Sequence, residues 1–247
     1  MNKSLNRLSL KQLFSNGSRP TQSSFESLID SMLNTVDDGI SKNAEDGLIL
    51  SPEGKDSSRV VSLYENIQDA FADWTIELGD EENRGFTISE PTPEGKSNPR
   101  IFFKKGGFTG IETLDPQTTF HVHGIAGADS RMGTFKNGLI AANGHWHTVV
   151  PDLDGCNAFE IVAQVGKVHT GKYAMAHAIA VSTFGKSKIN LTQANYGFCW
   201  NRIAFRFHGK MHNYSLQMKT RSDYGKDQNI KFHITKMWDI EMESLLK

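Results

Sequence analysis

Residues 101–124, IFFKKGGFTGIETLDPQTTFHVHG, carry the most informative pattern in the sequence. Two short apolar runs flank the pair Gly106-Gly107, which can adopt the positive φ angles of a tight turn at little steric cost. Asp115-Pro116 ends this unit, and a further apolar run follows. The stretch therefore predicts two strands around a glycine-rich corner and then a third strand.

This stretch resembles a segment of phage tail fibres and related bacterial fibre proteins, written G-N-V-G-I-G-T-x-x-P-x-x-x-L-x-V-x-G. Phe108 and Glu112 depart from its commonest form. In those families the segment lies in a trimeric, intertwined β shaft before a globular tip, so the resemblance implies self-association of three copies. The matching positions are Gly107, Gly110, Ile111, Thr113, Pro116, Phe120, Val122 and Gly124.

Upstream of the motif the chain is polar and rich in turns. Trp74, Ile76 and Leu78 alternate with polar residues, which predicts a half-buried strand. Because the strands are short, we expect a shaft domain at residues 41–133 that obtains its core by trimerisation. The other strands expected here are 47–50, 60–64, 86–88 and 101–103.

Residues 1–40 are expected to form a helical segment. Thr21 is a plausible N-cap, and apolar residues recur after it at helical spacing. One helix of about four turns cannot bury such a stripe alone. It must pack on the apolar lead-in before it, on sister copies or on another protein. The stripe consists of Phe25, Leu28, Ile29, Met32, Leu33 and Val36.

The same segment resembles the opening of fibre and baseplate-accessory proteins in phage-like contractile particles of Bacteroidetes-type bacteria. The resemblance implies a module for attachment or trimerisation, with baseplate or spike proteins as partners. A generic helical hairpin is the alternative. The resemblance covers Phe14, Pro20, Thr21, Phe25, Leu28, Ile29, Asp30 and Ser31, and the expected assembly residues are Phe14, Phe25, Leu28, Ile29, Met32 and Leu33.

The carboxy-terminal part, residues 134–247, has longer apolar runs separated by turns. Roughly eight strands at this spacing predict an antiparallel β-sandwich of the jelly-roll type as a tip domain. This part also resembles a tip found at the ends of fibre-like proteins in the same bacteria. The expected strands are 139–142, 146–150, 158–165, 174–184, 196–200, 203–208, 214–220 and 230–238.

Charge is distributed unevenly although the net charge is −1. Residues 37–100 contain 15 acidic and 6 basic residues, whereas residues 156–247 contain 6 acidic and 13 basic residues. Such asymmetry can orient subunits or favour an anionic partner, and solvated faces without a binding role are the alternative. No zinc finger or RNA-binding signature occurs, so no nucleic-acid role is expected.

The chain has no apolar run long enough for a membrane span and no apolar signal-peptide core, so membrane insertion is not expected. We expect assembly in the bacterial cytoplasm as part of a larger particle and an extracellular location after release. Cys156 and Cys199 lie far apart in apolar stretches, which predicts buried, reduced thiols, with a disulfide or a reactive thiol as alternatives.

Two histidine pairs are the strongest candidates for metal ligands. His121 with His123, and His145 with His147, each place two imidazoles on one side of a strand, a spacing found in zinc and copper sites. Surface histidines are the favoured interpretation, and no metal or other cofactor is expected. A contact with a glycan or a protein could be lined by aromatic residues with a polar group, although core packing is the favoured interpretation for most of them. These residues are Tyr173, Tyr196, Trp200, Tyr214, Tyr224 and Trp238.

These patterns together predict a mainly β protein with an N-terminal helical segment, a short intertwined β shaft and a sandwich tip. The expected function is structural rather than enzymatic: a trimeric tail fibre, or a protein around the baseplate or spike, of a phage tail-like contractile injection particle. Its tip would adhere to a glycan or protein on a target cell. The alternative is a glycan-binding or metal-dependent hydrolase at a fibre tip.

Overall fold

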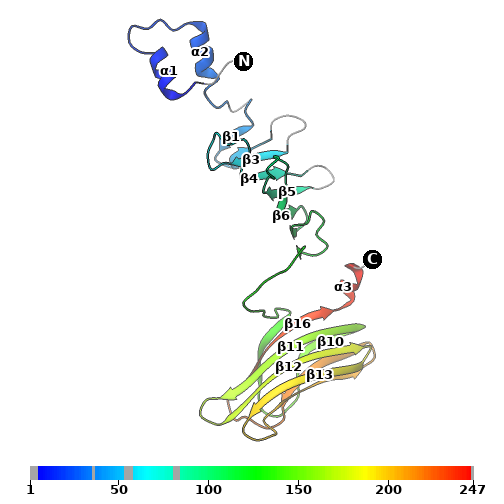
Figure 1. Ribbon diagram of the computed structural model, residues 1–247. Coiled ribbons are helices and arrows are strands. Elements are labelled where there is room, and N and C mark those ends of the chain that lie inside the picture. Colours follow the sequence, from blue (N-terminus) through cyan, green and yellow to red (C-terminus); the bar gives the residue numbers. More distant parts are fainter. Residues whose placement is uncertain (1–4, 35–36, 53–57, 80–83, 246–247) are drawn as a thin grey trace. The chain divides into compact units, whose positions relative to one another are not determined.

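The structure, a computed structural model, describes residues 5–34, 37–52, 58–79 and 84–245. The chain forms two compact units, Met1–Ala126 and Gly127–Lys247. Strands make up most of the regular structure and the helices are short, so the expected mainly β fold with a helical N-terminal segment is confirmed (Figure 1).

The first unit begins with two short helices, α1 (Arg7–Leu13) and α2 (Gln22–Ile29). The Oδ1 atom of Asn6 caps α1 by accepting a hydrogen bond from the Ser9 N–H at 2.9 Å. Thr21 occupies the N-cap of α2, as predicted, and its N–H donates to the Ser24 Oγ at 3.2 Å. No helix among the described residues is long and apolar enough to cross a membrane.

Helix α2 is shorter than its apolar stripe predicts. It ends at Ile29, and Met32 and Leu33 follow in a turn, while Val36 lies outside the described residues. The Ser31 hydroxyl donates to the Ser27 carbonyl at 2.6 Å and accepts the Leu5 N–H at 2.9 Å. Hydrogen bonds between a serine side chain and the backbone compete with the backbone hydrogen bonds of a helix. This competition explains why α2 ends at Ile29.

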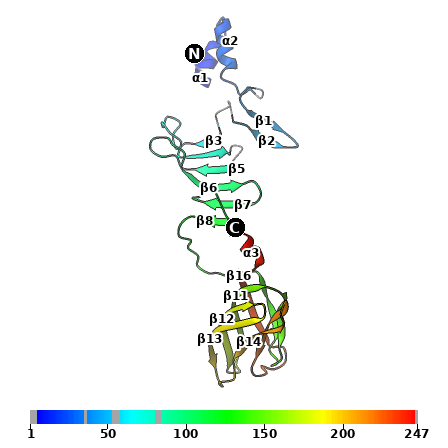
Figure 2. The same cartoon turned by 90° about the vertical axis from the view of Figure 1, so that its right-hand side faces the viewer.

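The strands of the first unit form a separate hairpin and a six-stranded sheet. In the sheet each strand lies beside the one that precedes it in the chain (Figure 2). All pairs are antiparallel except β7 and β8. The hairpin consists of β1 (Ile40–Asn43) and β2 (Gly47–Leu50), and the sheet of β3 (Arg59–Leu63), β4 (Trp74–Leu78), β5 (Gly85–Ser89), β6 (Pro99–Lys104), β7 (Phe108–Ile111) and β8 (Phe120–Val122).

The second unit is an antiparallel β-sandwich of a five-stranded and a three-stranded sheet, followed by α3 (Ile240–Leu245). The larger sheet has the order β13-β12-β11-β16-β9 and the smaller one β10-β15-β14. The strands are β9 (Lys136–Ala141), β10 (His147–Leu153), β11 (Cys156–Lys167), β12 (Lys172–Thr183), β13 (Lys186–Tyr196), β14 (Ile203–Lys210), β15 (Asn213–Thr220) and β16 (Asn229–Trp238).

The core of the sandwich fills the space between its two sheets. Strand β12 contributes alanines at every second position, because alternate side chains of a strand point to the same face. Larger side chains from both sheets pack against them. The fully buried members with large side chains are Tyr214, Phe159, Ile161, Ile203, Leu216, Met218, Ile230, Ile234 and Val165.

Two sequence-based expectations for the second unit are wrong. Residues 196–200 do not form a strand, since β13 ends at Tyr196 and a loop follows. Strand β13 escaped notice because it lies at a sheet edge, where most of its side chains are exposed and polar. Cys156, at the start of β11, and Cys199, in the loop, are exposed free thiols rather than buried ones.

Candidate assembly surface

A row of β-branched side chains crosses the whole six-stranded sheet. Strand register pairs one of these residues with the next across every strand boundary, and paired residues project from the same face. The row runs from the first strand of the sheet to the last and contains no polar residue. Its members are Val61, Ile76, Ile88, Ile101, Ile111 and Val122.

A second row of mostly aromatic residues lies beside the first on the same face. It consists of Leu78, Phe86, Phe103, Thr109 and Phe120. The pair Leu63 and Trp74, on β3 and β4, lies on the other side of the β-branched row. The rings of Phe86 and Phe103 stack with centroids 4.6 Å apart. We call the two rows and this pair the apolar sheet face.

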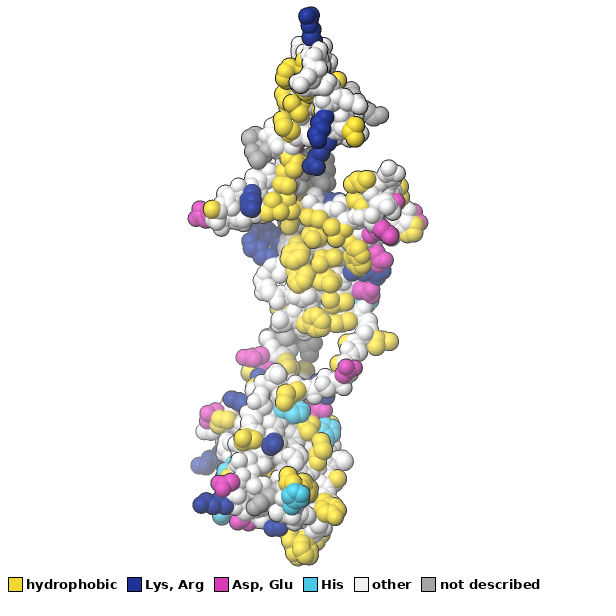
Figure 3. Space-filling model, turned by 90° about the vertical axis from the view of Figure 1, so that its left-hand side faces the viewer, with side chains coloured by type: hydrophobic (Ala, Val, Ile, Leu, Met, Phe, Trp, Pro, Cys, Tyr) yellow, Lys and Arg dark blue, Asp and Glu magenta, His cyan; other side chains and the backbone are white. Residues whose placement is uncertain are grey.

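The apolar sheet face is open to solvent in the single chain. Phe120 is 64% exposed, Trp74 42% and Phe86 38%. Hydrophobic side chains gather over this part of the molecule in the space-filling view (Figure 3). The predicted alternation in β4 is therefore real, but its apolar side is the open one, and the buried side chain is the polar Thr75.

The opposite face of the sheet is buried at its centre and carries mostly small, polar side chains. Its buried side chains include Thr75, Thr87 and Ser89, together with Phe102. Among the described residues of the first unit, Ala72 and Phe102 are the only buried hydrophobic residues. A sheet is stable when it buries an apolar face, so this unit lacks a core of ordinary size unless another molecule covers it.

Ion pairs reinforce the sheet at the ends of three adjacent interior strands, β5, β6 and β7. The Arg100 guanidinium donates to Glu90 at 2.6 and 2.8 Å and to Glu112 at 2.7 Å. The hydrogen bonds that Arg100 donates to Glu90, and secondarily to Glu112, raise the pKa of Arg100 above its ordinary value. This arrangement links β6 to the residues that follow β5 and β7.

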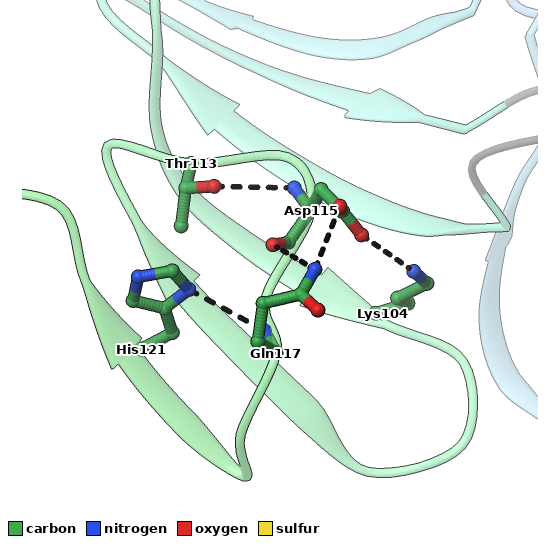
Figure 4. A network of polar contacts seen from close by, with 5 residues as sticks. All are labelled: Lys104, Thr113, Asp115, Gln117 and His121. Carbon is green, nitrogen blue, oxygen red and sulfur yellow. Dashed lines mark hydrogen bonds and ion pairs between the residues drawn. The ribbon is translucent and has the colours of Figure 1, made fainter. Parts of the chain in front are cut away.

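The fibre-like motif forms a compact turn that brings β8 alongside β7 in parallel. Thr113 accepts the Asp115 N–H at 3.2 Å, and the Gln117 amide donates to the Asp115 carboxylate at 2.7 Å (Figure 4). Lys104 lies 3.5 Å from the same carboxylate. The Gln117 N–H donates to His121 Nδ1 at 3.3 Å, which joins the turn to β8.

The motif residues have separate structural roles within this turn. Gly107 has a φ of +99° in the corner between β6 and β7, a conformation that favours glycine. A Cβ atom on Gly110 would lie 2.2 Å from the Thr113 carbonyl oxygen, so only glycine fits there. Pro116 is buried, and Ile111 belongs to the β-branched row. The motif therefore sets the end of the apolar sheet face.

The expected assembly residues of the N-terminal segment form a second exposed apolar group. Phe14 and Phe25 contact each other edge to face, with ring centroids 5.3 Å apart. Leu28 is half-buried, and the other members remain accessible in the single chain. Exposed fractions are 52% for Phe25, 61% for Ile29, 56% for Met32 and 75% for Leu33.

The two histidine pairs belong to different units and each makes separate contacts. His121 accepts a backbone hydrogen bond, as described above, and His123 is exposed. His147 Nε2 lies 3.0 Å from the Asn143 Oδ1, and His145 is exposed. No group of three or more His, Cys, Asp or Glu residues suited to a metal ion occurs in the part of the chain that the structure describes.

Comparisons with known proteins include a distant structural likeness. No family model and no curated protein sequence matches the chain. The tailspike protein of the Acinetobacter phage vB_ApiP_P1 is similar in structure over 46% of this chain, with 11% sequence identity and a TM-score of 0.30. The match covers 23% of that tailspike. What the chain does must therefore be argued from its own residues.

Proposed function

We propose that the protein is a homotrimeric structural component of a phage tail-like contractile injection particle, either a fibre or a protein around the baseplate or spike. The observation that carries the proposal is the apolar sheet face, which no described segment of the chain covers. The resemblance of residues 101–124 to fibre shafts supports it independently.

The size of the apolar sheet face favours a protein partner. Six strands about 4.8 Å apart, each about 17 Å long, give a face of roughly 500 Å² in plan. The largest apolar patch of a typical monomeric protein covers about 300–600 Å² and is often a functional surface. Burying apolar area contributes about 25 cal/mol per Å², so covering this face is strongly favourable.

The composition of the apolar sheet face favours identical copies as the partner. The face carries no charged side chain with which to select a different protein, and every copy presents the same rows of Val, Ile and Phe. A symmetric assembly brings these equal rows together around one axis. Three copies are proposed because the resembling fibre shafts are trimers.

The two ends of the chain would have different roles in the particle. The exposed apolar residues of α2 and the turn after it would dock on baseplate or spike proteins. The sandwich, which has its own core, would contact a glycan or protein on a target cell. Assembly would take place in the bacterial cytoplasm, and the assembled particle would act outside the cell after release.

Mass in solution tests the proposed assembly. Light scattering should give about three times the chain mass of 27.5 kDa for the wild type. Phe103→Asp, and the milder Phe120→Asp at the edge strand, should shift the mass to one chain, because a carboxylate cannot be buried unpaired among apolar side chains. The sandwich should unfold at the same temperature in all variants.

The matched control is Ile67→Asp, which adds the same charge at a position 88% exposed and outside the apolar sheet face. Its mass should equal that of the wild type. A wild-type protein that is a stable monomer at micromolar concentration contradicts the proposal. So does a trimer that survives both substitutions on the sheet.

A further inference from the structure

The loop between β13 and β14, residues 197–202, is held rigidly by the sandwich. Asn201 is fully buried, and its side-chain amide donates to the Tyr196 carbonyl at 3.1 Å and accepts from the Ser222 hydroxyl at 3.2 Å. The Asn201 N–H donates to the Phe198 carbonyl at 2.9 Å. The Asn195 side chain donates to that same carbonyl at 3.0 Å. Both the NH2 group and the oxygen of the Asn201 side chain therefore form hydrogen bonds that hold the loop in place.

Close packing further restricts the start of this loop. Gly197 has a φ of +88°, and a Cβ atom there would lie 2.3 Å from the Gly171 carbonyl oxygen and 2.8 Å from the Asn201 amide nitrogen. The loop therefore lies directly against the β11–β12 turn, and no larger residue fits between them. A loop this restricted gives up little conformational entropy when it binds something.

The same rigid loop presents aromatic side chains to solvent. Phe198 is 66% exposed and Trp200 is 54% exposed, and their rings stack with centroids 5.2 Å apart and planes 9° apart. Tyr196, directly before the loop, is 69% exposed. A loop that contributes to a core usually buries its aromatic side chains. In this loop the buried residue is an asparagine, and the aromatic side chains are exposed to solvent.

A shallow hollow adjoins these aromatic residues on the outer face of the five-stranded sheet. It has a volume of about 360 Å³ and shares Tyr196 with the aromatic group. Its other walls supply a flat ring, from Tyr173, and an amide group, from Gln164. The Asn195 side chain is paired in register with buried Ala174 and donates to the Phe198 carbonyl, so it belongs to the inner face. Aromatic surface beside a few hydrogen-bonding groups is the usual composition of a site for a small polar ligand.

We infer that Phe198, Trp200 and Tyr196, with the adjoining hollow, form a saccharide-binding site for the pyranose units of a cell-surface polysaccharide. The C–H groups on one side of a pyranose stack on aromatic rings, and its hydroxyls pair with amides such as that of Gln164. The inference rests on the proposed role of the sandwich in contacting a target cell, and it specifies the residues and the ligand class.

Surface area favours a saccharide over a protein partner. An aromatic side chain has about 150–250 Å² of surface, so Phe198 and Trp200 at the exposures given above offer roughly 250 Å² together. A standard protein interface needs about 800 Å² from each partner. One or two sugar rings match the smaller area, and three copies of a weak site would bind a repeating polymer with avidity.

The test is binding of the intact full-length protein to an array of immobilised mono- and oligosaccharides, followed by titration of the best soluble sugar. Trp200→Ala and Phe198→Ala should each weaken binding about fivefold, which corresponds to roughly 1 kcal/mol per stacked ring. Met211→Ala is the matched control, because Met211 is 67% exposed in the turn between β14 and β15, at the other end of the strands. It should bind as the wild type does.

Unfolding temperatures should be equal in all three variants, since the substituted side chains are exposed. Absence of binding to any saccharide overturns the inference, as does binding that Trp200→Ala and Phe198→Ala leave unchanged. Binding instead to phosphatidylcholine vesicles, lost in the same variants, also overturns it in favour of a lipid surface. A trimeric mass with no saccharide binding would leave the proposed assembly intact and remove this site alone.

Discussion

Tyr224 is the residue with the clearest link between burial and pH. It belongs to the sandwich core, is 3% exposed, and its hydroxyl has no hydrogen-bond partner among the described residues. Burial raises the pKa of Tyr224 to about 12, compared with about 10 for a tyrosine in an unfolded chain. The folded protein therefore keeps this proton at a pH where the unfolded chain loses it.

We predict that the sandwich loses stability between pH 10 and 12. The contribution of Tyr224 is fully present below pH 10 and is lost as pH rises through the folded pKa. Tyr224→Phe should remove the part of the stability loss between pH 10 and 12 that is caused by ionisation of Tyr224. At neutral pH it should keep or raise the free energy of unfolding, by about 1 kcal/mol at most, because an unpaired buried hydroxyl contributes no bond.

Urea unfolding at a series of pH values measures this effect. Tyr196→Phe serves as the control, since that ring is exposed and outside the core, and it should follow the wild-type profile. A Tyr224→Phe protein that loses stability above pH 10 as steeply as the wild type contradicts the prediction.

The exposed apolar residues of helix α2 are the proposed anchor of the protein in the particle. Ile29→Asp should leave the helices folded, because Ile29 is 61% exposed, while Phe25 contacts Phe14 within the chain and is the less selective position to change. Particles purified from the producing bacterium should lose this protein when Ile29 is replaced. Quantitative mass spectrometry of the particles measures the loss.

Ser23→Asp is the matched control for this prediction, because Ser23 is exposed near the start of the same helix, where a negative charge is favourable. Particles with this variant should contain the normal amount of protein. Normal incorporation of Ile29→Asp would show that α2 is not the anchor.

Elements with strong periodicity could be predicted from the sequence, and elements at edges could not. The motif at 101–124 gave three strands because its glycines and proline mark every turn. The Ala-rich run in β12 was assigned as strand because Gly and Val flank it. Strand β13 was misplaced because its polar, exposed side chains carry no hydrophobic period.

The direction in which the apolar sheet face points could not be predicted. The alternation of apolar and polar residues in β4 predicts that one face of the strand is buried. It does not tell which of the two faces is covered by the chain's own residues, because the alternation has a period of two in either case. The structure shows that Thr75 points inward and Ile76 outward. The loop at residues 197–202 could not be predicted either, because the apolar run at 196–200 predicts a strand and only the burial of Asn201 reveals a loop.

At the scale of the whole molecule, the two units differ in how they obtain a core. The sandwich encloses nineteen buried hydrophobic residues of its own, whereas the described part of the first unit encloses two. A fragment of residues 127–247 should therefore fold as a monomer. Its unfolding temperature should lie within about 5 °C of the sandwich transition in the full chain, equivalent to about 1 kcal/mol.

Calorimetry and light scattering of the fragment test this independence. A fragment of residues 5–126 provides the comparison and should be trimeric or aggregated, but not a soluble folded monomer. An unfolded or trimeric sandwich fragment would contradict the division into a self-sufficient and a dependent unit.

The strand order of the six-stranded sheet has a consequence for biosynthesis. Because each strand pairs with the one translated just before it, the sheet can grow as the polypeptide emerges from the ribosome. The apolar sheet face is then exposed to solvent while translation continues. In the assembly that we propose, identical chains emerging from neighbouring ribosomes on one messenger would be the nearest molecules able to cover this face.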